Sequence, residues 1–373
     1  MNTNQHTGLK ILHLSSEATW RGGEQQIAYL IEELQQAGIL ILVACRKGSA
    51  FETYCQKQSI RYFSLSFNGS FDLSTALAIR NICRKETIDL VHIHSAKSHS
   101  LAVIAHVLGN RIPLILSRRV DFPVRSNTLT QWKYNHPAVK RIICVSETIE
   151  KIVRSSVKRP DRSTTVHSGI DISRIKAPSG LLKTRYRLTD ETLLVGNTSA
   201  LAGHKDYFTF IRTAEIFRQY DIPARFFMIG DGPEKEKLQA YIQDEGLTDY
   251  VIMTGFLNNI HEVLPELDIF LMTSQTEGLG TSVLDAFAAR VPVVATRAGG
   301  IPEMVIHEQT GLLAEIKNAQ QLATHLKRLV EQPKFREALT NHAYQHLTTS
   351  FTKEKMAEST LRIYREVLGE KTP

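Results

Sequence analysis

No apolar run in the sequence reaches the roughly 18 residues that a membrane-spanning helix needs. The first residues, M-N-T-N-Q-H-T-G, pass straight into a strand-like segment and show none of the charged, apolar and small-residue regions of a signal peptide. The sequence therefore predicts a cytoplasmic protein. It leaves open a peripheral attachment to the inner face of the cytoplasmic membrane.

Cysteine is scarce, because the chain of 373 residues contains only Cys45, Cys55, Cys83 and Cys144, without a C-x-x-C pair. Most of these lie in or beside apolar runs, where a free thiol behaves as a small hydrophobe, and this favours a reducing compartment. The sequence also lacks a D-x-D triplet and any His/Cys cluster at metal-ligand spacing. We therefore expect neither a metal nor a cofactor.

Acidic residues are the minority in the first half of the chain. Residues 1–180 contain 24 Lys and Arg against 13 Asp and Glu, and much of the excess lies between Arg111 and Arg162. Such a surface attracts a phosphorylated substrate, anionic lipid headgroups or nucleic acid, or it is an ordinary solvated face. Nucleic acid is the least favoured of these, because the basic residues lack interleaved aromatic stacking positions.

Short β-rich apolar runs alternate with helical patterns in both halves, which is typical of parallel sheets covered by helices. The expected strands are 10–15, 39–45, 61–66, 89–94, 113–117, 141–146, 193–199, 225–230, 250–255, 268–274 and 291–296. The length exceeds that of most single domains, and A-P-S-G at 177–180 marks a boundary. We expect an α/β protein of two doubly wound domains, 1–178 and 179–373, with an amphipathic last helix at 353–368 returning to the N-terminal domain.

In open parallel sheets the ligand lies beyond the carboxyl ends of the strands, so the expected site is the cleft between the two domains. The segment T-E-G-L-G-T-S-V-L-D (276–285) places Glu277 and Asp285 around a glycine turn at a helix start. Such a turn lets backbone amides approach phosphate closely. Asp285 lies among apolar residues, so either it binds a polar partner, such as the vicinal hydroxyls of a ribose, or it faces solvent.

This segment resembles the signature of the family-4 glycosyltransferases, in which a glutamate, seven residues and a second acid precede a strand and a G-G-x-x-E turn. Here these are Glu277, Asp285, R-V-P-V-V-A-T (290–296) and G-G-I-P-E (299–303). Other motifs follow in the family's order: W-R-G-G-E (20–24), D-L-V-H-I-H (89–94), V-S-E-T-I (145–149), H-S-G-I-D (167–171) and T-G-L-L (310–313). The resemblance spans nearly the whole chain. It implies the GT-B fold, whose two Rossmann-like domains bind the acceptor (first) and the nucleotide-sugar donor (second).

The resemblance also implies an activity: retaining, metal-independent transfer of a hexose-type sugar from a UDP- or GDP-linked donor to a glycan or lipid-linked acceptor, in polysaccharide or lipopolysaccharide synthesis. The catalytic residues that it implies are His94, Lys205 and Glu277. The donor-binding residues are Gly22, Gly23, Ser199, His204, Gly230, Asp231, Gly255, Phe256, Gly278, Leu279, Gly280, Thr281, Ser282 and Asp285. The acceptor-binding residues are Trp20, Arg21, Arg118 and Arg119. Peripheral contact of the basic domain with an anionic membrane is a further implication.

The chain departs from the family pattern at two positions. Family members carry an arginine and a lysine after the first strand of the second domain, whereas S-A-L-A-G-H-K-D (199–206) keeps Lys205 but has Ala200 in the arginine position. We hypothesise that His204, Arg118 or Arg119 supplies the missing positive charge. The second acid, Asp285, is one methylene shorter than the usual glutamate.

Two alternative functions remain at this point. The first keeps the fold and changes the reaction, to that of a GT-B sugar-nucleotide epimerase or a disaccharide phosphorylase. The paired-acid signature disfavours the epimerase. The second is a degenerate, non-catalytic protein that binds nucleotide sugar, for which Ala200 and Asp285 are the only support.

Overall fold

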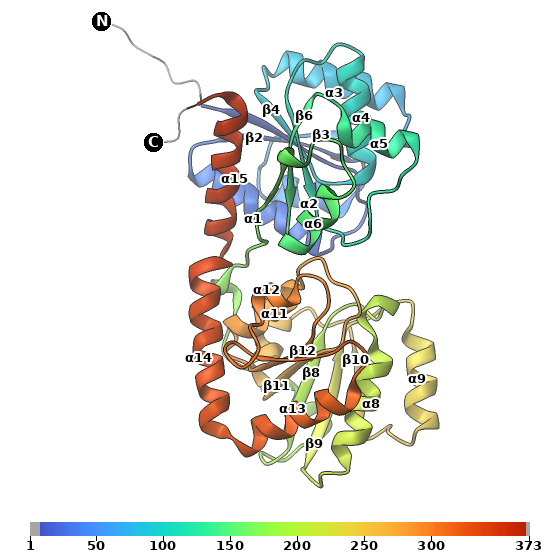
Figure 1. Ribbon diagram of the computed structural model, residues 1–373, viewed down its shortest axis with the longest axis vertical. Coiled ribbons are helices and arrows are strands. Elements are labelled where there is room, and N and C mark those ends of the chain that lie inside the picture. Colours follow the sequence, from blue (N-terminus) through green and yellow to red (C-terminus); the bar gives the residue numbers. More distant parts are fainter. Residues whose placement is uncertain (1–7, 371–373) are drawn as a thin grey trace, which may run out of the picture. The chain divides into compact units, whose positions relative to one another are not determined.

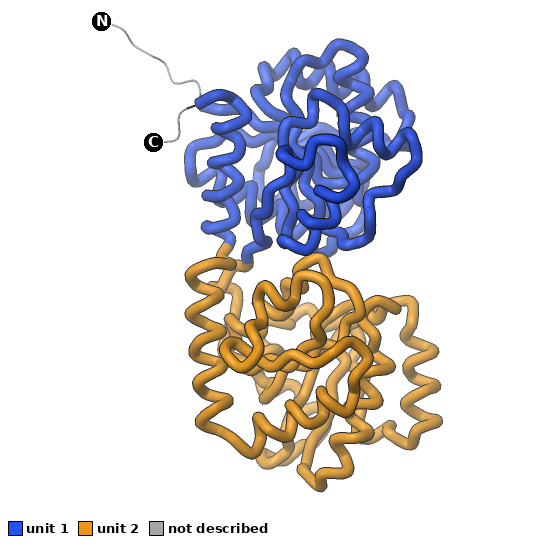
Figure 2. The backbone as a smooth tube through the Cα atoms, viewed as in Figure 1, with its two compact units in different colours: residues 1–169, 353–373 blue, residues 170–352 orange. Residues whose placement is uncertain are grey.

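The computed structural model describes residues 8–370, which divide into two compact units (Figure 2). Unit 1 consists of the chain up to Gly169 together with the segment from Lys353 onward, and unit 2 consists of Ile170–Thr352. The division therefore falls before the A-P-S-G turn at which the sequence analysis placed it. That turn belongs to unit 2 because Glu266 Oε1 accepts hydrogen bonds from Ser179 Oγ (2.8 Å) and the Leu181 amide (2.9 Å).

Unit 1 contains a seven-stranded parallel sheet in the order β3-β2-β1-β4-β5-β6-β7. Its strands are β1 (Lys10–Ser15), β2 (Leu40–Arg46), β3 (Tyr62–Leu65), β4 (Leu90–Ile93), β5 (Leu114–Arg118), β6 (Val139–Cys144) and β7 (Ser163–Thr165). Its helices are α1 (Gly22–Gln36), α2 (Ala50–Lys57), α3 (Leu73–Lys85), α4 (Ala96–Val107), α5 (Thr128–Asn135), α6 (Glu147–Arg154) and α15 (Lys353–Leu368). Side chains such as Ser49, Asp72 and Ser146 cap helix N-termini by accepting a first-turn amide.

Unit 2 contains a six-stranded sheet in the order β10-β9-β8-β11-β12-β13, also parallel. Its strands are β8 (Leu193–Thr198), β9 (Ala224–Ile229), β10 (Val251–Gly255), β11 (Ile269–Met272), β12 (Val293–Thr296) and β13 (Leu312–Ala314). Its helices are α7 (Leu181–Tyr186), α8 (Tyr207–Arg218), α9 (Lys235–Asp244), α10 (Ile260–Val263), α11 (Thr281–Ala288), α12 (Ile301–Met304), α13 (Ala319–Glu331) and α14 (Pro333–Ser350).

The last helix, α15, spans the residues expected for it and packs against α1 in unit 1 (Figure 1). Its apolar stripe of Met356, Ile363 and Tyr364 is buried in the same core as α1 and the central strands. The two-sheet α/β architecture and all eleven expected strands are confirmed, while β7 and β13 were not expected. Each of these two strands has only three residues, too few for a periodic pattern.

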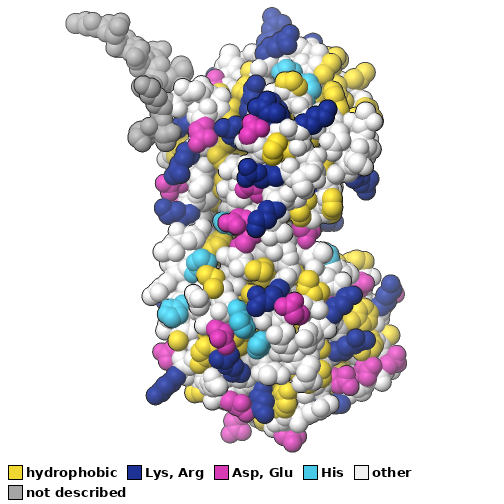
Figure 3. All heavy atoms as spheres, viewed as in Figure 1, with side chains coloured by type: hydrophobic (Ala, Val, Ile, Leu, Met, Phe, Trp, Pro, Cys, Tyr) yellow, Lys and Arg dark blue, Asp and Glu magenta, His cyan; other side chains and the backbone are white. Residues whose placement is uncertain are grey.

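Three expectations about composition can be compared with this structure. All four cysteines are free and buried. Among residues 8–370, no helix has the length and apolarity that a membrane span requires. Lys and Arg side chains are scattered over the drawn face of unit 1, with acidic side chains between them (Figure 3).

Candidate active site

In unit 2 the strand order reverses at β8, which lies between β9 and β11. Loops that leave the carboxyl ends of two such neighbouring strands meet at one edge of the sheet, where open α/β proteins bind ligands. The loop after β8 carries Lys205 and the loop after β11 carries Glu277. This topology explains how two residues 72 positions apart become neighbours.

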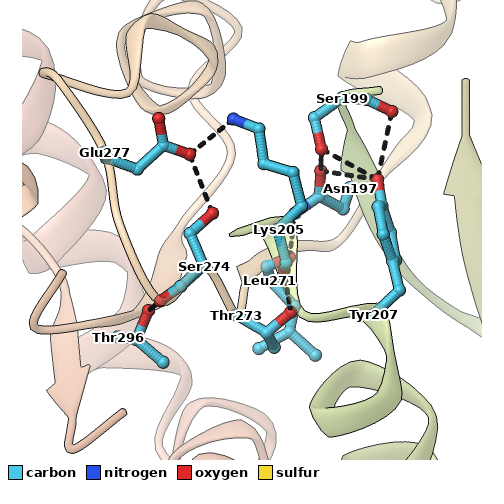
Figure 4. Close-up of polar contacts among 9 residues, drawn as sticks. All are labelled: Asn197, Ser199, Lys205, Tyr207, Leu271, Thr273, Ser274, Glu277 and Thr296. Carbon is cyan, nitrogen blue, oxygen red and sulfur yellow. Dashed lines mark hydrogen bonds and ion pairs between the residues drawn. The ribbon is translucent and has the colours of Figure 1, made fainter. Parts of the chain in front are cut away.

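Lys205 and Glu277 form a buried ion pair at this edge (Figure 4). The Lys205 Nζ atom is 2.5 Å from Glu277 Oε1, and the two side chains are 14% and 9% exposed. The Ser274 hydroxyl donates to the same carboxylate oxygen at 2.8 Å. Glu277 is thus held in one orientation by a cation and a hydroxyl. A carboxylate in this state can accept sugar hydroxyls, and the ammonium can neutralise phosphate.

The backbone around this pair is fixed by a second layer of hydrogen bonds. Thr273 Oγ1 donates to the carbonyls of Lys205 (3.1 Å) and Asp206 (3.0 Å), which connects the end of β11 to the turn that carries the lysine. Thr296 Oγ1 donates to the Ser274 carbonyl at 2.6 Å, which connects β12 to the same loop. Because these hydroxyls bond backbone carbonyls, the two threonines hold the loops that carry Lys205 and Glu277 in position.

The G-G-I-P-E turn supports Glu277 from the other side. The Gly300 amide donates to the Glu277 carbonyl at 3.2 Å. Gly299 has a φ of +53°, and a Cβ at this position would lie 1.9 Å from the Glu277 carbonyl oxygen. Only glycine fits there, so this part of the signature serves the placement of the glutamate.

The turn from Glu277 into α11 places three more candidates at a helix start. Gly280 is the N-cap of α11 with a φ of +90°, and Thr281 and Ser282 form the first helical turn. Leu279 is only 3% exposed, so its side chain anchors the loop in the core. The Val283 amide donates to the Gly280 carbonyl (3.0 Å), so the first-turn amides without an acceptor in the helix, which a ligand could use, are those of Thr281 and Ser282.

The second acid, Asp285, is half-buried on α11. Burial raises the pKa of its carboxyl from 3.8 to about 6, and Arg174 acts in the opposite direction. Among the described residues, no hydrogen bond to its carboxylate is found. A carboxylate that is partly desolvated and lacks hydrogen-bond donors is suited to accept the hydroxyls of a ligand.

The remaining donor candidates of unit 2 surround β8. Gly230 has a φ of +153°, and a Cβ there would lie 2.1 Å from the Ser199 carbonyl oxygen, so the two loops touch through backbone. Ser199 Oγ is engaged with Asn197 Oδ1 (2.8 Å) and Tyr207 OH (2.9 Å), which favours a structural role for this hydroxyl (Figure 4).

Four more candidates of unit 2 lie near its surface. His204 is exposed beside Lys205, and Gly255 has a φ of +74° at the end of β10. Phe256 is 72% exposed, a large apolar surface that would be available for stacking on a base. The Asp231 carboxylate accepts from the Gly232 amide (2.8 Å) and pairs with Lys235 (3.4 Å). Their contact with a donor stays a prediction.

Unit 1 has its own strand-order reversal at β1, and three histidines meet there. His13 on β1 and His92 on β4 are register partners, and His94 follows β4. The His13 and His94 rings stack at 5.1 Å with 3° between their planes, and the His92 and His94 centroids are 4.1 Å apart. The spacing of histidines along the sequence does not predict this group, because the pairing of β1 with β4 brings the three rings together.

Burial decides the charge of these three histidines, and hydrogen bonds decide the tautomers of His94 and His13. Burial holds the pKa of all three rings far below 6.5, so they are neutral at pH 7. Arg119 Nη2 can only donate, so His94 Nδ1 accepts it at 3.2 Å, and His94 Nε2–H then donates to His13 Nδ1 at 2.9 Å. The His92 nitrogens contact Tyr364 OH (2.5 Å) and Ser117 Oγ (2.8 Å).

Three ligand atoms of this cluster lie within 4.8 Å of one another, a spacing that a metal ion could bridge. Five of the six ring nitrogens are nevertheless hydrogen-bonded, and the guanidinium of Arg119 lies beside them. The arrangement is therefore a hydrogen-bonded chain and not a set of free ligands. Because both nitrogens of His94 are engaged, its expected contact with a donor sugar requires an exchange of partners and stays a prediction.

The two adjacent arginines expected to bind the acceptor have different environments. Arg118 is 7% exposed and donates to Tyr134 OH (2.7 Å) and to the Phe122 carbonyl, with its guanidinium near both rings. This residue stabilises the fold of unit 1. Arg119 instead turns toward His94 and the start of α1. Consecutive extended residues point to opposite sides, and this separates the two roles.

The other unit 1 candidates lie in the β1–α1 loop. Trp20 is 36% exposed and its ring packs near Tyr54 (5.1 Å) and Phe51 (5.8 Å). Arg21 is exposed, and its amide donates to Glu24 Oε2 at 3.1 Å. Gly22 and Gly23 form the first turn of α1.

Comparison with known proteins places this chain in a family. The sequence family described as glycosyltransferase family 4 matches residues 20–174, and the one described as glycosyl transferases group 1 matches residues 182–346. This chain belongs to the family-4 glycosyltransferases. The curated relatives agree: N-acetyl-alpha-D-glucosaminyl L-malate synthase of Bacillus anthracis is 25% identical over 84% of each chain. Lipopolysaccharide core biosynthesis glycosyltransferase LpsD of Rhizobium meliloti is 22% identical over 95% of this chain and 98% of LpsD.

Solved structures of this glycosyltransferase's relatives establish its fold. Anabaena HepE in complex with UDP superposes with a TM-score of 0.84 at 20% identity, covering 96% of this chain and all of HepE. A glycosyltransferase from Rickettsia africae gives a TM-score of 0.87 at 17% identity over 98% of this chain and all of the other. The fold is GT-B, as the sequence motifs implied.

Three side chains that interact with candidate site residues were not among the sequence-predicted ones. They are His13 on β1, Tyr364 on α15 and Arg174 at the end of a short 3-10 helix, and all lie outside the motifs. His13 carried one usable signal, since a strand histidine pairing with a D-x-V-H-x-H strand would face the same side of the sheet. Tyr364 and Arg174 carried none.

Proposed function

We propose that this glycosyltransferase moves a hexose-type sugar from a nucleotide-diphosphate donor to a hydroxyl of a glycan or lipid-linked acceptor, with retention of anomeric configuration, in cell-surface polysaccharide synthesis. The observation that carries the donor half is the buried Lys205–Glu277 pair at the carboxyl edge of unit 2. The names of two relatives support this pathway. LpsD is named for lipopolysaccharide core biosynthesis, and a second relative is named for transfer to a diphospho-undecaprenol-linked acceptor.

In this proposal Glu277 accepts hydrogen bonds from donor-sugar hydroxyls, Lys205 neutralises the diphosphate, and Asp285 binds the ribose hydroxyls. The bond from the anomeric carbon to the diphosphate breaks while the bond to the acceptor oxygen forms on the same face. The acceptor's proton passes to the departing phosphate oxygen. No carboxylate is assigned as a covalent nucleophile, because Glu277 is already held by Lys205 and Ser274.

Uracil is the favoured base of the donor. HepE has been solved with UDP and with UDP-glucose, and it covers 96% of this chain. The sequence also allowed a GDP-linked donor, so a screen of donors should compare GDP-linked with UDP-linked sugars.

The proposal is tested by incubating the enzyme with UDP-hexose and candidate glycan acceptors and reading the product by NMR. The expected product is a new glycosidic bond with the anomeric configuration of the donor. An inverted linkage would contradict retention. Isomerised nucleotide sugar without transfer would favour the epimerase, disaccharide formed or cleaved with free phosphate would favour the phosphorylase, and nucleotide binding without any turnover would favour the non-catalytic protein.

Peripheral membrane contact is the second part of the proposal. The segment after β5 exposes Val120, Phe122, Leu129 and Trp132 at 39%, 60%, 37% and 38%, with basic Arg125 among them. Apolar side chains beside basic ones suit an anionic bilayer surface.

Flotation with anionic vesicles is expected to recover the wild-type protein, and neutral vesicles are expected to recover much less. Phe122→Ser should weaken this recovery, whereas Phe256→Ser in unit 2, a phenylalanine that is even more exposed, should not. Equal absence from both kinds of vesicle would remove the membrane from the proposal.

A further inference from the structure

The hydroxyl of Tyr364 is buried on the apolar stripe of α15. The side chain is fully buried, and its ring packs in the core that α15 shares with α1 and the central strands. A phenylalanine would fill the same space without an oxygen, and a buried hydroxyl costs free energy unless it is hydrogen-bonded. Among the described residues, its hydrogen bond is to His92 Nδ1, at 2.5 Å. The hydroxyl therefore serves this histidine and not the packing of the helix.

The helix that carries Tyr364 is held firmly against unit 1. In the first turn of α15, Lys353 Nζ lies 3.1 Å from Glu33 Oε1 and 3.2 Å from Glu32 Oε1, both on α1. The Lys353 and Glu33 side chains are each only 10% exposed, and separating a buried pair of charges is costly. Tyr364 thus reaches His92 from a helix whose position is fixed.

The ring of His92 is held at both of its nitrogens. Besides the bond to Tyr364, His92 Nε2 lies 2.8 Å from Ser117 Oγ on β5. The Tyr364 ring meets the imidazole edge-on, with 5.5 Å between centroids and 86° between planes. A buried imidazole with a partner on each nitrogen cannot rotate without losing one of these hydrogen bonds.

His94 packs on this fixed ring. It follows His92 by two positions, so both side chains lie on the same side of the sheet, with 4.1 Å between their centroids. The other neighbours of His94, Arg119 and His13, occupy its two nitrogens. Contact with a donor sugar needs one of these nitrogens. Packing on His92 is therefore the contact that can persist while His94 exchanges partners.

We propose that Tyr364 is a positioning residue for His94 and that it acts through His92. Its hydroxyl fixes the His92 ring, and that ring holds His94 at the carboxyl edge of the unit 1 sheet, in the orientation in which it meets the donor sugar. The contact of His94 with the donor is the one step that rests on the proposed function. The last helix of the chain is thereby part of the support of the active site, as well as a cover for the core.

The test is a double-variant cycle on the full chain, measured as release of UDP from UDP-glucose without an acceptor. Tyr364→Phe removes a single oxygen. It is expected to lower kcat about tenfold and to leave KM within about twofold, because a misplaced group mainly loses transition-state stabilisation. In the His94→Ala background the same change should lower kcat no further, since its effect passes through His94.

Two further variants accompany this cycle. Ser117→Ala removes the other hydrogen bond of His92 and should give the same pattern, so it decides the question if Tyr364→Phe does not fold. Tyr62→Phe is the matched control, because it removes a tyrosine hydroxyl on the edge strand β3 that accepts from Gln56 Nε2 at 2.9 Å. It should leave kcat and KM unchanged.

A second measurement does not depend on turnover, and so decides the inference whichever sugar nucleotide is the donor. In protein with ¹⁵N-labelled histidines, His94 of the wild type should show the single Nε2–H tautomer that its bond from Arg119 requires. Tyr364→Phe should move the ring-nitrogen signals of His94 toward the average of its two tautomers. Tyr62→Phe should leave them in place.

Three results would overturn the inference. Unchanged kcat or unchanged His94 signals in Tyr364→Phe would make this tyrosine a structural residue, even if the melting temperature fell. A loss of kcat that adds to the loss in His94→Ala would mean that Tyr364 acts by another route. Full turnover in His94→Ala would contradict the proposed role of His94 itself, and this failure is distinguishable because that variant keeps Tyr364 intact.

Discussion

Lys205→Met is expected to lower kcat about 10²–10³-fold, the loss typical when a group that stabilises developing transition-state charge is removed. The same change should lower the free energy of unfolding by about 3–5 kcal/mol, because it leaves Glu277 as an unpaired, buried carboxylate. Steady-state kinetics at saturating donor and denaturant unfolding of the same preparation measure the two effects.

The double variant Lys205→Met, Glu277→Gln separates stability from catalysis. Without either charge, much of the lost stability should return, while kcat stays as low as in the single variant. Lys183→Met is the matched control, because its pair with Asp190 is exposed and should contribute less than about 1 kcal/mol. If the double variant recovered activity together with stability, the ion pair would be structural and not catalytic.

Asp285→Asn is expected to stabilise the protein and weaken donor binding at once. Raising a carboxyl pKa from 3.8 to about 6 costs the folded state about 3 kcal/mol at neutral pH. Because the folded pKa lies above the unfolded one, this penalty is absent below pH 4, grows between pH 4 and 6, and is complete above pH 6. The asparagine variant should therefore be more stable than wild type above pH 6 and equally stable below pH 4. Denaturant unfolding across this range is the measurement.

Donor affinity should depend on the same ionisation of Asp285, but in the opposite sense to stability. Ionisation destabilises the folded protein and strengthens donor binding. The ionised carboxylate accepts ribose hydroxyls, and a hydrogen bond to a charged group contributes about 1.5–3 kcal/mol. Wild-type affinity for UDP-glucose, whose diester phosphates do not titrate near pH 6, should fall as the pH drops through 6. The affinity of Asp285→Asn should be low throughout, and Asp285→Glu should retain the binding. A pH-independent wild-type affinity equal to that of the asparagine variant would make Asp285 a structural residue.

The architecture could be predicted from the sequence because buried parallel strands are apolar throughout, as in I-F-L-M of β11. The Lys205–Glu277 contact could also have been predicted, since both residues follow neighbouring central strands at the point where strand order reverses. The start of α11 at Gly280 could be predicted from the glycines of T-E-G-L-G. Most candidate residues of the donor site could therefore be predicted from motifs in which a strand end is followed by a turn.

The sequence could not separate Arg118 from Arg119, because which of two adjacent arginines faces the core depends on where β5 ends. It could not assemble His13, His92 and His94, because their meeting depends on the pairing of β1 with β4. It placed the domain boundary nine residues too late, after residue 178 and not after Gly169, because the hydrogen bonds of Glu266 decide to which unit the A-P-S-G turn belongs. In each case the deciding interaction is between segments far apart in the chain.

The central claim, that the carboxyl edge of unit 2 binds the diphosphate and ribose of the donor, is tested most directly by one calorimetric titration of UDP at pH 7.5. Wild type should bind, and Lys205→Met and Asp285→Asn should each lose at least about tenfold in affinity. Lys183→Met should bind as wild type does. UDP affinity that is equal in all four proteins would contradict the account.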